Sequence, residues 1–129
     1  VGTTAAGWAD LGLDLLLINL GTNDYRIGAA TPAAYRQGLE ALTTAIRASN
    51  PDTGLIFVVP PQTDGTVVTP LSQYRDACYE HCMTAGCEML NLLDGWGGYT
   101  TDLFTDSLHL NAAGASAYVG MANAAFLKL

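Results

Sequence analysis

The chain has 129 residues, of which 50% are hydrophobic and 13% are charged. This length permits no more than one domain, and this composition excludes a disordered chain. The formal net charge is −7 and only five Lys and Arg residues are present, which argues against nucleic-acid binding because phosphate contacts need cationic side chains. No apolar stretch reaches about 18 residues, so the sequence predicts no membrane span.

The first predicted element is a strand over Leu13–Leu20, where only Asp14 and Asn19 interrupt an apolar run. Such a run is typical of a strand that helices cover on both faces. It ends at Gly21, which allows a tight turn or a positive φ, and Asn23 follows shortly after. We therefore expect Asn23 at the carboxyl end of a buried strand, which is where ligands bind in open α/β sheets.

An Asn in that position is suited to catalysis. The amide group of Asn23 offers an uncharged donor on a rigid element, which is what stabilises a developing oxyanion. The alternative is an ordinary Asx-turn, in which Asn23 bonds only to its own loop.

Two more strands and three helices are predicted further along the chain. The helices begin at favourable caps, because Thr31 and Thr69 each precede a proline at the first helical position and Asn111 precedes the last helix. Apolar residues recur in them at helical spacing, and Asn50 and Gly86 supply stops. The predicted strands are Leu55–Val59 and Glu88–Leu92, and the predicted helices are Pro32–Ser49, Pro70–Ala85 and Ala112–Leu127.

Strands that alternate with helices predict an α/β fold with a doubly wound parallel sheet, in three α/β/α layers of the flavodoxin-like kind. Three strands leave the apolar first strand with one bare edge, which soluble proteins avoid. The sequence also begins at Val1 without an initiator Met. We therefore expect one domain over residues 1–129 that is incomplete at its amino end. The rest of its own chain is expected to cover the edge.

A second motif lies near the carboxyl end. Asp106 and His109 stand just before the last predicted helix, and one turn of chain can bring the two side chains together. The carboxylate then fixes the tautomer of the imidazole and stabilises the imidazolium, as in the base half of an acyl-transfer triad. The same spacing also arises by chance in loops, and His109 could instead cap or line the start of the helix.

Together the two motifs resemble the SGNH (GDSL) hydrolase family. Its pattern has a Gly-Asp-Ser nucleophile block near the start, a block with an oxyanion-hole glycine, then G-x-N-D, and finally D-x-x-H. The resemblance covers about the whole chain. The residues that follow D-x-x-H also match those that usually follow it in the family. The segments that carry it are Gly21-Thr22-Asn23-Asp24, Asp106-Ser107-Leu108-His109 and Leu110-Asn111-Ala112-Ala113-Gly114.

The resemblance implies a role for each matching residue. Asn23 would be an oxyanion-hole donor, His109 the general base, and Asp106 the acid that orients His109. Gly2 is the candidate for what remains of the glycine block, although it lies nearer to G-x-N-D than the family pattern leads one to expect.

The sequence departs from the family in having no Gly-Asp-Ser block. Its serines are poor nucleophiles: two lie at helix ends, one lies inside the last helix with no strand before it, and one lies between Asp106 and His109. We therefore expect the nucleophilic serine upstream of Val1, and the alternative is a protein that has lost its hydrolase chemistry. The serines are Ser49, Ser72, Ser107 and Ser116.

Two other groups of residues are candidates for function. Trp96 and Tyr99 lie in a Gly-rich loop beyond the last strand and are candidates for the rim of a substrate site, or they pack over their own loop. Three alternatives are open for the cysteines: a metal site, a disulfide or buried free thiols. The residues concerned are Cys78, Cys82 and Cys87, with His81 among them. We expect free thiols and no metal, because Cys78 and Cys82 fit the apolar stripe of their helix.

The resemblance implies a serine esterase that hydrolyses small acyl esters, with acetyl on a carbohydrate as the expected case. The partner would be a small-molecule or glycan ester, and neither a metal nor an organic cofactor is needed. This segment by itself is expected to be inactive. The competing hypothesis is a non-catalytic glycan-binding or structural module that keeps the fold.

Overall fold

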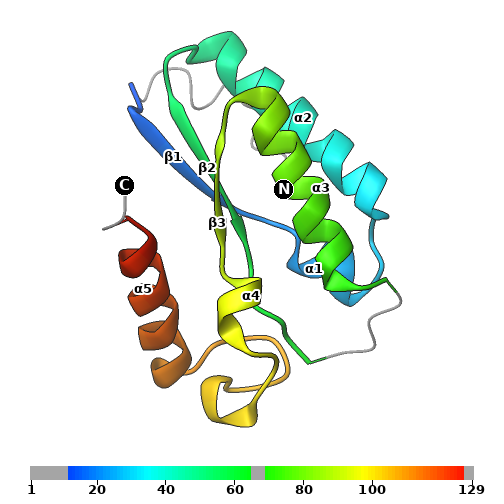
Figure 1. Cartoon of the computed structure of the whole chain (residues 1–129), viewed down its shortest axis with the longest axis vertical. Coiled ribbons are helices and arrows are strands. Elements are labelled where there is room, and N and C mark those ends of the chain that lie inside the picture. The colour runs from blue at the N-terminus through cyan, green and yellow to red at the C-terminus, as the bar shows by residue number, and fades with distance from the viewer. Residues whose placement is uncertain (1–11, 65–68, 127–129) are drawn as a thin grey trace.

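The computed structural model describes residues 12–64 and 69–126. Its centre is a parallel three-stranded sheet in the order β1-β2-β3. The strands are β1 at Leu15–Asn19, β2 at Gly54–Val59 and β3 at Glu88–Asn91. Helices α2 (Pro32–Ser49) and α3 (Leu71–Ala85) cover one face of the sheet, and α5 (Ala112–Phe126) lies on the other (Figure 1). The three α/β/α layers predicted from the sequence are therefore present.

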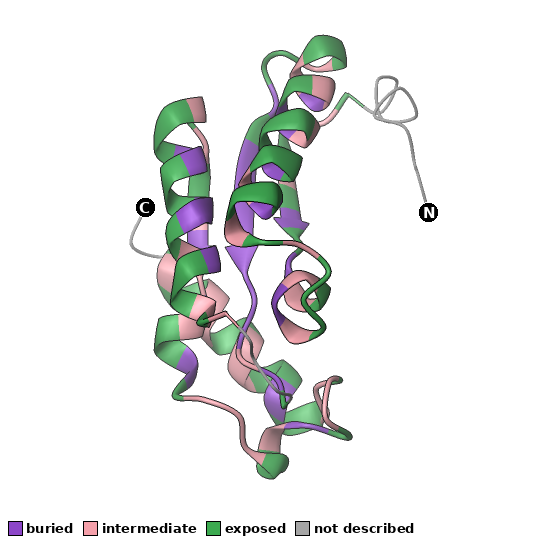
Figure 2. Ribbon diagram, turned by 90° about the vertical axis from the view of Figure 1, so that its right-hand side faces the viewer, coloured by how far each residue is buried: buried purple, intermediate pink, exposed green. Residues whose placement is uncertain are grey.

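The sheet contributes to two hydrophobic cores, because successive side chains of a strand point to opposite faces. The core toward α2 and α3 receives Ile18, Leu55, Phe57 and Val59. The core toward α5 receives Ile56, Val58, Leu90 and Leu92. Figure 2 shows buried residues concentrated on the strands and on the sides of α2 and α3 that face them.

β1 is less covered than the sequence predicts. Only Ile18 of this strand is buried, whereas Leu15 and Leu17 are 56% and 46% exposed. Within the described ranges, β1 pairs with β2 alone, with Leu16 opposite Leu55. The prediction of a strand covered on both faces is therefore not met within the described residues, which leave Leu15 and Leu17 about half exposed.

The helix boundaries follow local capping. α2 has the predicted bounds, and the hydroxyl of Thr31 accepts the N–H of Ala34 at 3.2 Å. α3 begins at Leu71, after an extended Pro70 with ψ of 133°, so the prediction that Thr69 caps a helix starting at Pro70 is wrong. Gly86 ends α3 in the left-handed conformation, with φ of 62°.

α5 begins as predicted at Ala112, after Asn111, whose side-chain oxygen accepts the N–H of Gly114 at 2.9 Å. Its described part ends at Phe126. Three short elements were not predicted, because each is too short to show a helical period. They are α1 at Thr22–Arg26, α4 at Leu93–Trp96 and the 3₁₀ helix η2 at Thr101–Leu103. Among the helices of the described residues, none combines the length and the hydropathy needed to cross a bilayer.

Candidate active site

Loops from three parts of the chain meet at a pocket of about 320 Å³. It lies where the chain leaves β1 and β2, at the carboxyl edge of the parallel sheet. Asn23 and His109 both line this pocket, although they come from opposite ends of the sequence. The other lining residues are Asn19, Thr22, Pro60, Pro61, Thr63, Phe104, Leu108, Leu110 and Tyr118.

Asn23 reaches the pocket from α1, directly after a turn at Gly21. Gly21 has φ of 116°, a conformation that favours glycine, and a Cβ there would lie only 3.2 Å from the ring of Tyr35, which is a tight contact. The Asn23 side chain is exposed and makes no hydrogen bond to any described residue. The alternative of an Asx-turn therefore does not describe this side chain, and its amide is available to a ligand.

Asp106 and His109 form a close pair. The Oδ2 atom of Asp106 lies 2.8 Å from Nδ1 of His109, and its Oδ1 atom accepts the backbone N–H groups of Leu108 and His109, each at 2.7 Å. These hydrogen bonds hold the pKa of the Asp106 carboxyl far below its usual range, and the bond with the His109 side chain contributes most. The ionised carboxylate accepts the Nδ1 proton, which leaves Nε2 as the basic nitrogen of the neutral ring.

The loop around this pair is a small closed hairpin. Phe104 and Leu110 form an antiparallel bridge, and the N–H of Thr105 donates to the carbonyl oxygen of His109 at 2.8 Å. A Cβ on Gly114 would come within 2.1 Å of the carbonyl oxygen of Leu103, so α5 can pack this closely only because Gly114 has no side chain. The hairpin is thus held against the start of α5.

Two polar residues that line the pocket were not predicted from the sequence. The Asn19 side-chain amide, at the end of β1, donates to the Tyr118 hydroxyl of α5 at 3.2 Å. Burial raises the pKa of Tyr118, so the phenol stays neutral. Its own hydrogen has no acceptor among the described residues. Tyr118 therefore adds a second donor to the pocket, and no sequence signal linked it to a residue so far away in the chain.

Trp96 and Tyr99 do not line the pocket that holds Asn23 and His109. The Trp96 ring lies edge-on to Phe104 with 6.2 Å between centroids, and Tyr99 packs on the same ring at 5.0 Å. Trp96 is only 8% exposed. Of the two alternatives, these contacts favour packing over their own loop, where both rings support Phe104, which does line the pocket.

No serine among the described residues lines the pocket. The hydroxyl of Ser107 instead accepts a hydrogen bond from Arg26 at 3.1 Å. Gly2, the candidate for the glycine block, lies outside the described residues.

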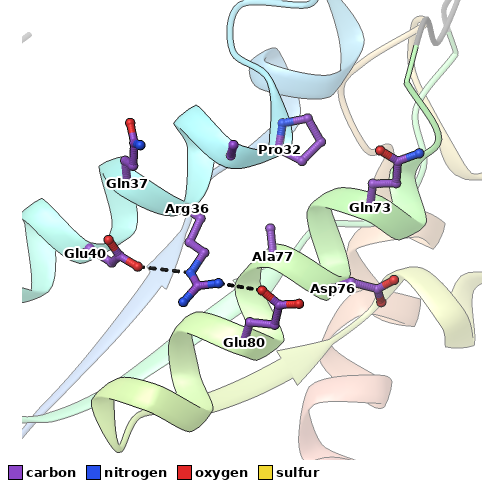
Figure 3. A pocket seen from close by; sticks show the side chains of 9 residues that line it. Pro32, Arg36, Gln37, Glu40, Gln73, Asp76, Ala77 and Glu80 are labelled. Carbon is purple, nitrogen blue, oxygen red and sulfur yellow. Dashed lines mark hydrogen bonds and ion pairs between the residues drawn. The ribbon is translucent and has the colours of Figure 1, made fainter.

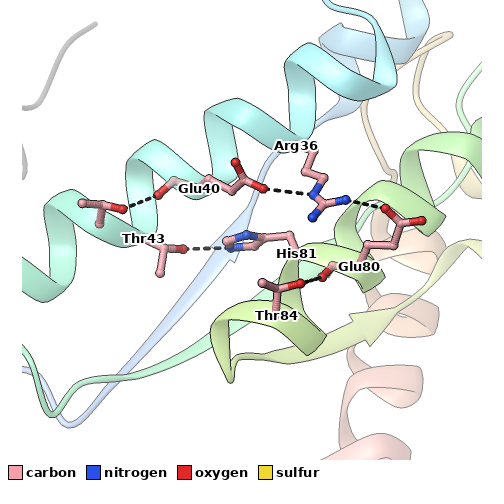
Figure 4. Close-up of polar contacts among 7 residues, drawn as sticks. Arg36, Glu40, Thr43, Glu80, His81 and Thr84 are labelled. Carbon is pink, nitrogen blue, oxygen red and sulfur yellow. Dashed lines mark hydrogen bonds and ion pairs between the residues drawn. The ribbon is translucent and has the colours of Figure 1, made fainter.

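The three cysteines are free, and Cys78 and Cys82 are buried. In the described ranges no three His, Cys, Asp or Glu side chains are grouped to hold a metal ion. His81, which lies among the cysteines, is 1% exposed and shares a hydrogen bond of 2.9 Å with the Thr43 hydroxyl (Figure 4). Its ring lies edge-on to Phe57. His81 is therefore a core residue that joins α2 to α3.

A larger hollow of about 540 Å³ lies between α2 and α3, and none of Asn23, Asp106 and His109 lines it. Arg36 crosses it and pairs with Glu40 and Glu80, as Figure 3 shows. These are exposed ion pairs, which contribute little to stability and offer no group arranged for catalysis. We assign this hollow no function.

The sequence matches the model of the GDSL-like lipase/acylhydrolase family over residues 2–117. Since this match covers most of the chain, the protein belongs to that family, in agreement with the resemblance of the two motifs. A search by sequence among curated proteins gave no match.

Solved structures of esterases share the fold. One is a carbohydrate esterase family 3 protein from Talaromyces cellulolyticus, with 22% identity and a TM-score of 0.78 over 98% of this chain. Another is a peptidoglycan O-acetylesterase, with 18% identity and a TM-score of 0.75 over 95% of this chain. An acetyl esterase mutant with acetate ion has 22% identity and a TM-score of 0.77 over 98% of this chain. The chain spans 63%, 40% and 63% of their respective lengths.

Proposed function

We propose that this chain carries the base, the orienting acid and one oxyanion donor of an SGNH-type serine esterase. The observation that carries the proposal is the shared pocket of Asn23 and His109, with Asp106 bonded to Nδ1 of His109. The nucleophilic serine would come from residues outside this sequence, because no serine of this sequence is among the residues that line the pocket.

The geometry supports a simple path for the proton. The serine hydroxyl would attack the ester carbonyl while Nε2 of His109 takes its proton, and Asp106 would stabilise the imidazolium. The tetrahedral oxyanion would receive a hydrogen bond from the Asn23 amide. His109 would then give the proton to the leaving alcohol, and a water activated by the same nitrogen would release the acid. This path needs no metal or organic cofactor.

A small acyl group, with acetyl on a carbohydrate as the first case, is the proposed substrate. The pocket supports this choice because apolar side chains such as Pro60, Phe104 and Leu110 line it beside the amide of Asn23 and the phenol of Tyr118. A methyl group suits the apolar part, whereas the polar tips suit a hydroxyl-bearing acceptor. The names of the similar structures point to the same class of ester.

The test uses the full natural protein that carries this segment. His109→Ala is expected to lower kcat on an acetyl ester by roughly 10⁴–10⁶-fold, because the triad acts as a unit. Tyr79→Ala, a change at an exposed position of α3, should leave kcat unchanged and serves as the control. Residues 1–129 by themselves should not hydrolyse p-nitrophenyl acetate above background.

Two outcomes would overturn the proposal. One is a natural protein whose esterase activity survives His109→Ala. The other is a natural protein that binds glycan esters without hydrolysing them, which would establish the non-catalytic module instead.

A further inference from the structure

The helix that presents Asn23 cannot hold its own position. α1 has five residues, and a helix this short is not stable by itself in water. Contacts with other segments must therefore set where the Asn23 amide lies. Two side chains of α1 make such contacts: the buried Tyr25, whose hydroxyl donates to the carbonyl oxygen of Pro61 at 2.9 Å, and Arg26.

Arg26 connects α1 to two other loops at once. Its Nε atom donates to the carbonyl oxygen of Asp64, in the loop after β2, at 3.2 Å. Its Nη2 atom donates to the hydroxyl of Ser107 at 3.1 Å. The planar guanidinium has several donors in fixed directions, so one side chain can reach two acceptors on different segments.

The two loops that Arg26 reaches are also bonded to each other. The N–H of Asp64 donates to the carbonyl oxygen of Ser107 at 3.0 Å, which closes a triangle between Arg26, Asp64 and Ser107. Ser107 stands between Asp106 and His109 in the sequence, and Arg26 stands one helical turn from Asn23. These three hydrogen bonds therefore link the loop that carries His109 to helix α1, which carries Asn23.

We propose that Arg26 is a positioning residue that sets the separation between the Asn23 amide and the His109 imidazole. This inference rests on the proposed function and gives Ser107 a role as the acceptor of Arg26, not as a nucleophile. Arg26 is not among the residues that line the pocket, so we assign it a positioning role and not a catalytic one. Its charge also makes both hydrogen bonds stronger than neutral ones, which suits a contact between loops.

The effect falls on the transition state. The oxyanion and the transferred proton must meet Asn23 and His109 at hydrogen-bonding distance together, and a shift of about 1 Å can cost about 10²-fold in rate. Ground-state binding of an ester depends less on this separation. Loss of Arg26 is therefore expected to lower kcat much more than it changes KM.

The experiment compares kcat and KM in the full natural protein for Arg26→Ala, Arg26→Lys, Ser107→Ala and the double variant Arg26→Ala with Ser107→Ala. We expect Arg26→Ala to lower kcat by about 10- to 100-fold with KM within about twofold. Arg26→Lys should recover only part of kcat, because an ammonium cannot hold both acceptors in the same geometry. The double variant should be no worse than Arg26→Ala, since the two residues act through one bond.

The matched control is Arg75→Ala, which removes an arginine that pairs with Asp76 and Asp94 at the surface and should leave kcat unchanged. A kcat of Arg26→Ala equal to that of the natural protein, while His109→Ala is inactive, would overturn this inference and leave the proposed function standing. Full additivity of Arg26→Ala and Ser107→Ala would do the same. A natural protein without esterase activity would overturn both. If Arg26→Ala does not fold, Arg26→Lys and Ser107→Ala carry the test.

Discussion

The two faces of the sheet are built in different ways. Toward α2 and α3, twelve buried residues form one cluster, and His81 and Thr43 close it with a buried hydrogen bond. Toward α5, the cluster has four buried residues, and Gly114 is the one buried residue of α5 in its described part. The first face is held by packing, whereas the candidate active site beside the second is held by hydrogen bonds between loops.

The difference separates stability from activity. A change in the dense core should unfold the protein without specific effects on catalysis, whereas a change in the loops should alter catalysis at little cost in stability. The following three predictions test this separation, beginning with the largest expected effect.

Phe57→Ala should cost about 3–5 kcal/mol in the free energy of unfolding. Phe57 is 1% exposed at the centre of β2, so its removal leaves a cavity under α3. The measurement is denaturant unfolding of the natural protein. Val119→Ala is the matched control, because Val119 is 54% exposed on α5 and its loss should cost less than about 0.5 kcal/mol. Equal losses in the two variants would contradict the comparison of the two faces.

Asn23→Ala should lower kcat by roughly 10²–10³-fold, which is about 2.7–4 kcal/mol of transition-state stabilisation. The free energy of unfolding should stay the same, because the side chain is exposed and makes no hydrogen bond to the described residues. Asn123→Ala, at an exposed position of α5 away from the pocket, controls for loss of an amide. An unchanged kcat in Asn23→Ala would remove Asn23 from the site.

His81 should make the dense face sensitive to acid, as the smallest of the three effects. Burial lowers the pKa of His81, and Arg36 and Arg47 act in the same direction while Glu40 opposes them. The unfolded chain binds a proton below about pH 6.5 and the folded chain does not, so stability is lost as the pH falls from there toward the folded-state pKa. Each unit by which the pKa is lowered is worth about 1.4 kcal/mol.

The measurement is the Tm between about pH 6.5 and 5, above the range in which most carboxylates titrate. His81→Asn should lose the slope in this window. Thr43→Val removes the hydrogen bond to His81 but keeps the imidazole, so it should be less stable at every pH and retain the slope. A natural protein whose Tm is flat across the window would show that protonation of His81 does not limit its stability.

The sequence predicted the scaffold well because the scaffold follows local rules. Thr31 and Pro32 are enough to start α2, and the apolar period fixes which side faces the sheet. At Thr69-Pro70 the same rule placed the start of α3 one residue too early, since a proline with its φ of −54° fits both the cap and the first turn.

The site was predicted in part. The positions of Asn23, Asp106 and His109 could be inferred because they belong to two short motifs with a recognisable order. The contact of Asn19 with Tyr118 and that of Arg26 with Ser107 could not be inferred, because each joins residues distant in the sequence through side chains that carry no local pattern. For Trp96 the sequence left a substrate rim and packing over its own loop both open, because a Gly-rich loop does not reveal which way its aromatic side chains turn.

The exposed side of β1 has a consequence for how the chain associates. Along this strand, in the part of the chain that the structure describes, the only pairing partner is β2, and Leu15 and Leu17 are about half exposed beside the unpaired edge. An extended segment can add to such an edge through main-chain hydrogen bonds, and its alternate side chains can then pack on the exposed leucines. A segment that pairs with the edge of β1 would block this addition. With the edge left unpaired, copies of the chain could add to one another at high concentration and form cross-β aggregates.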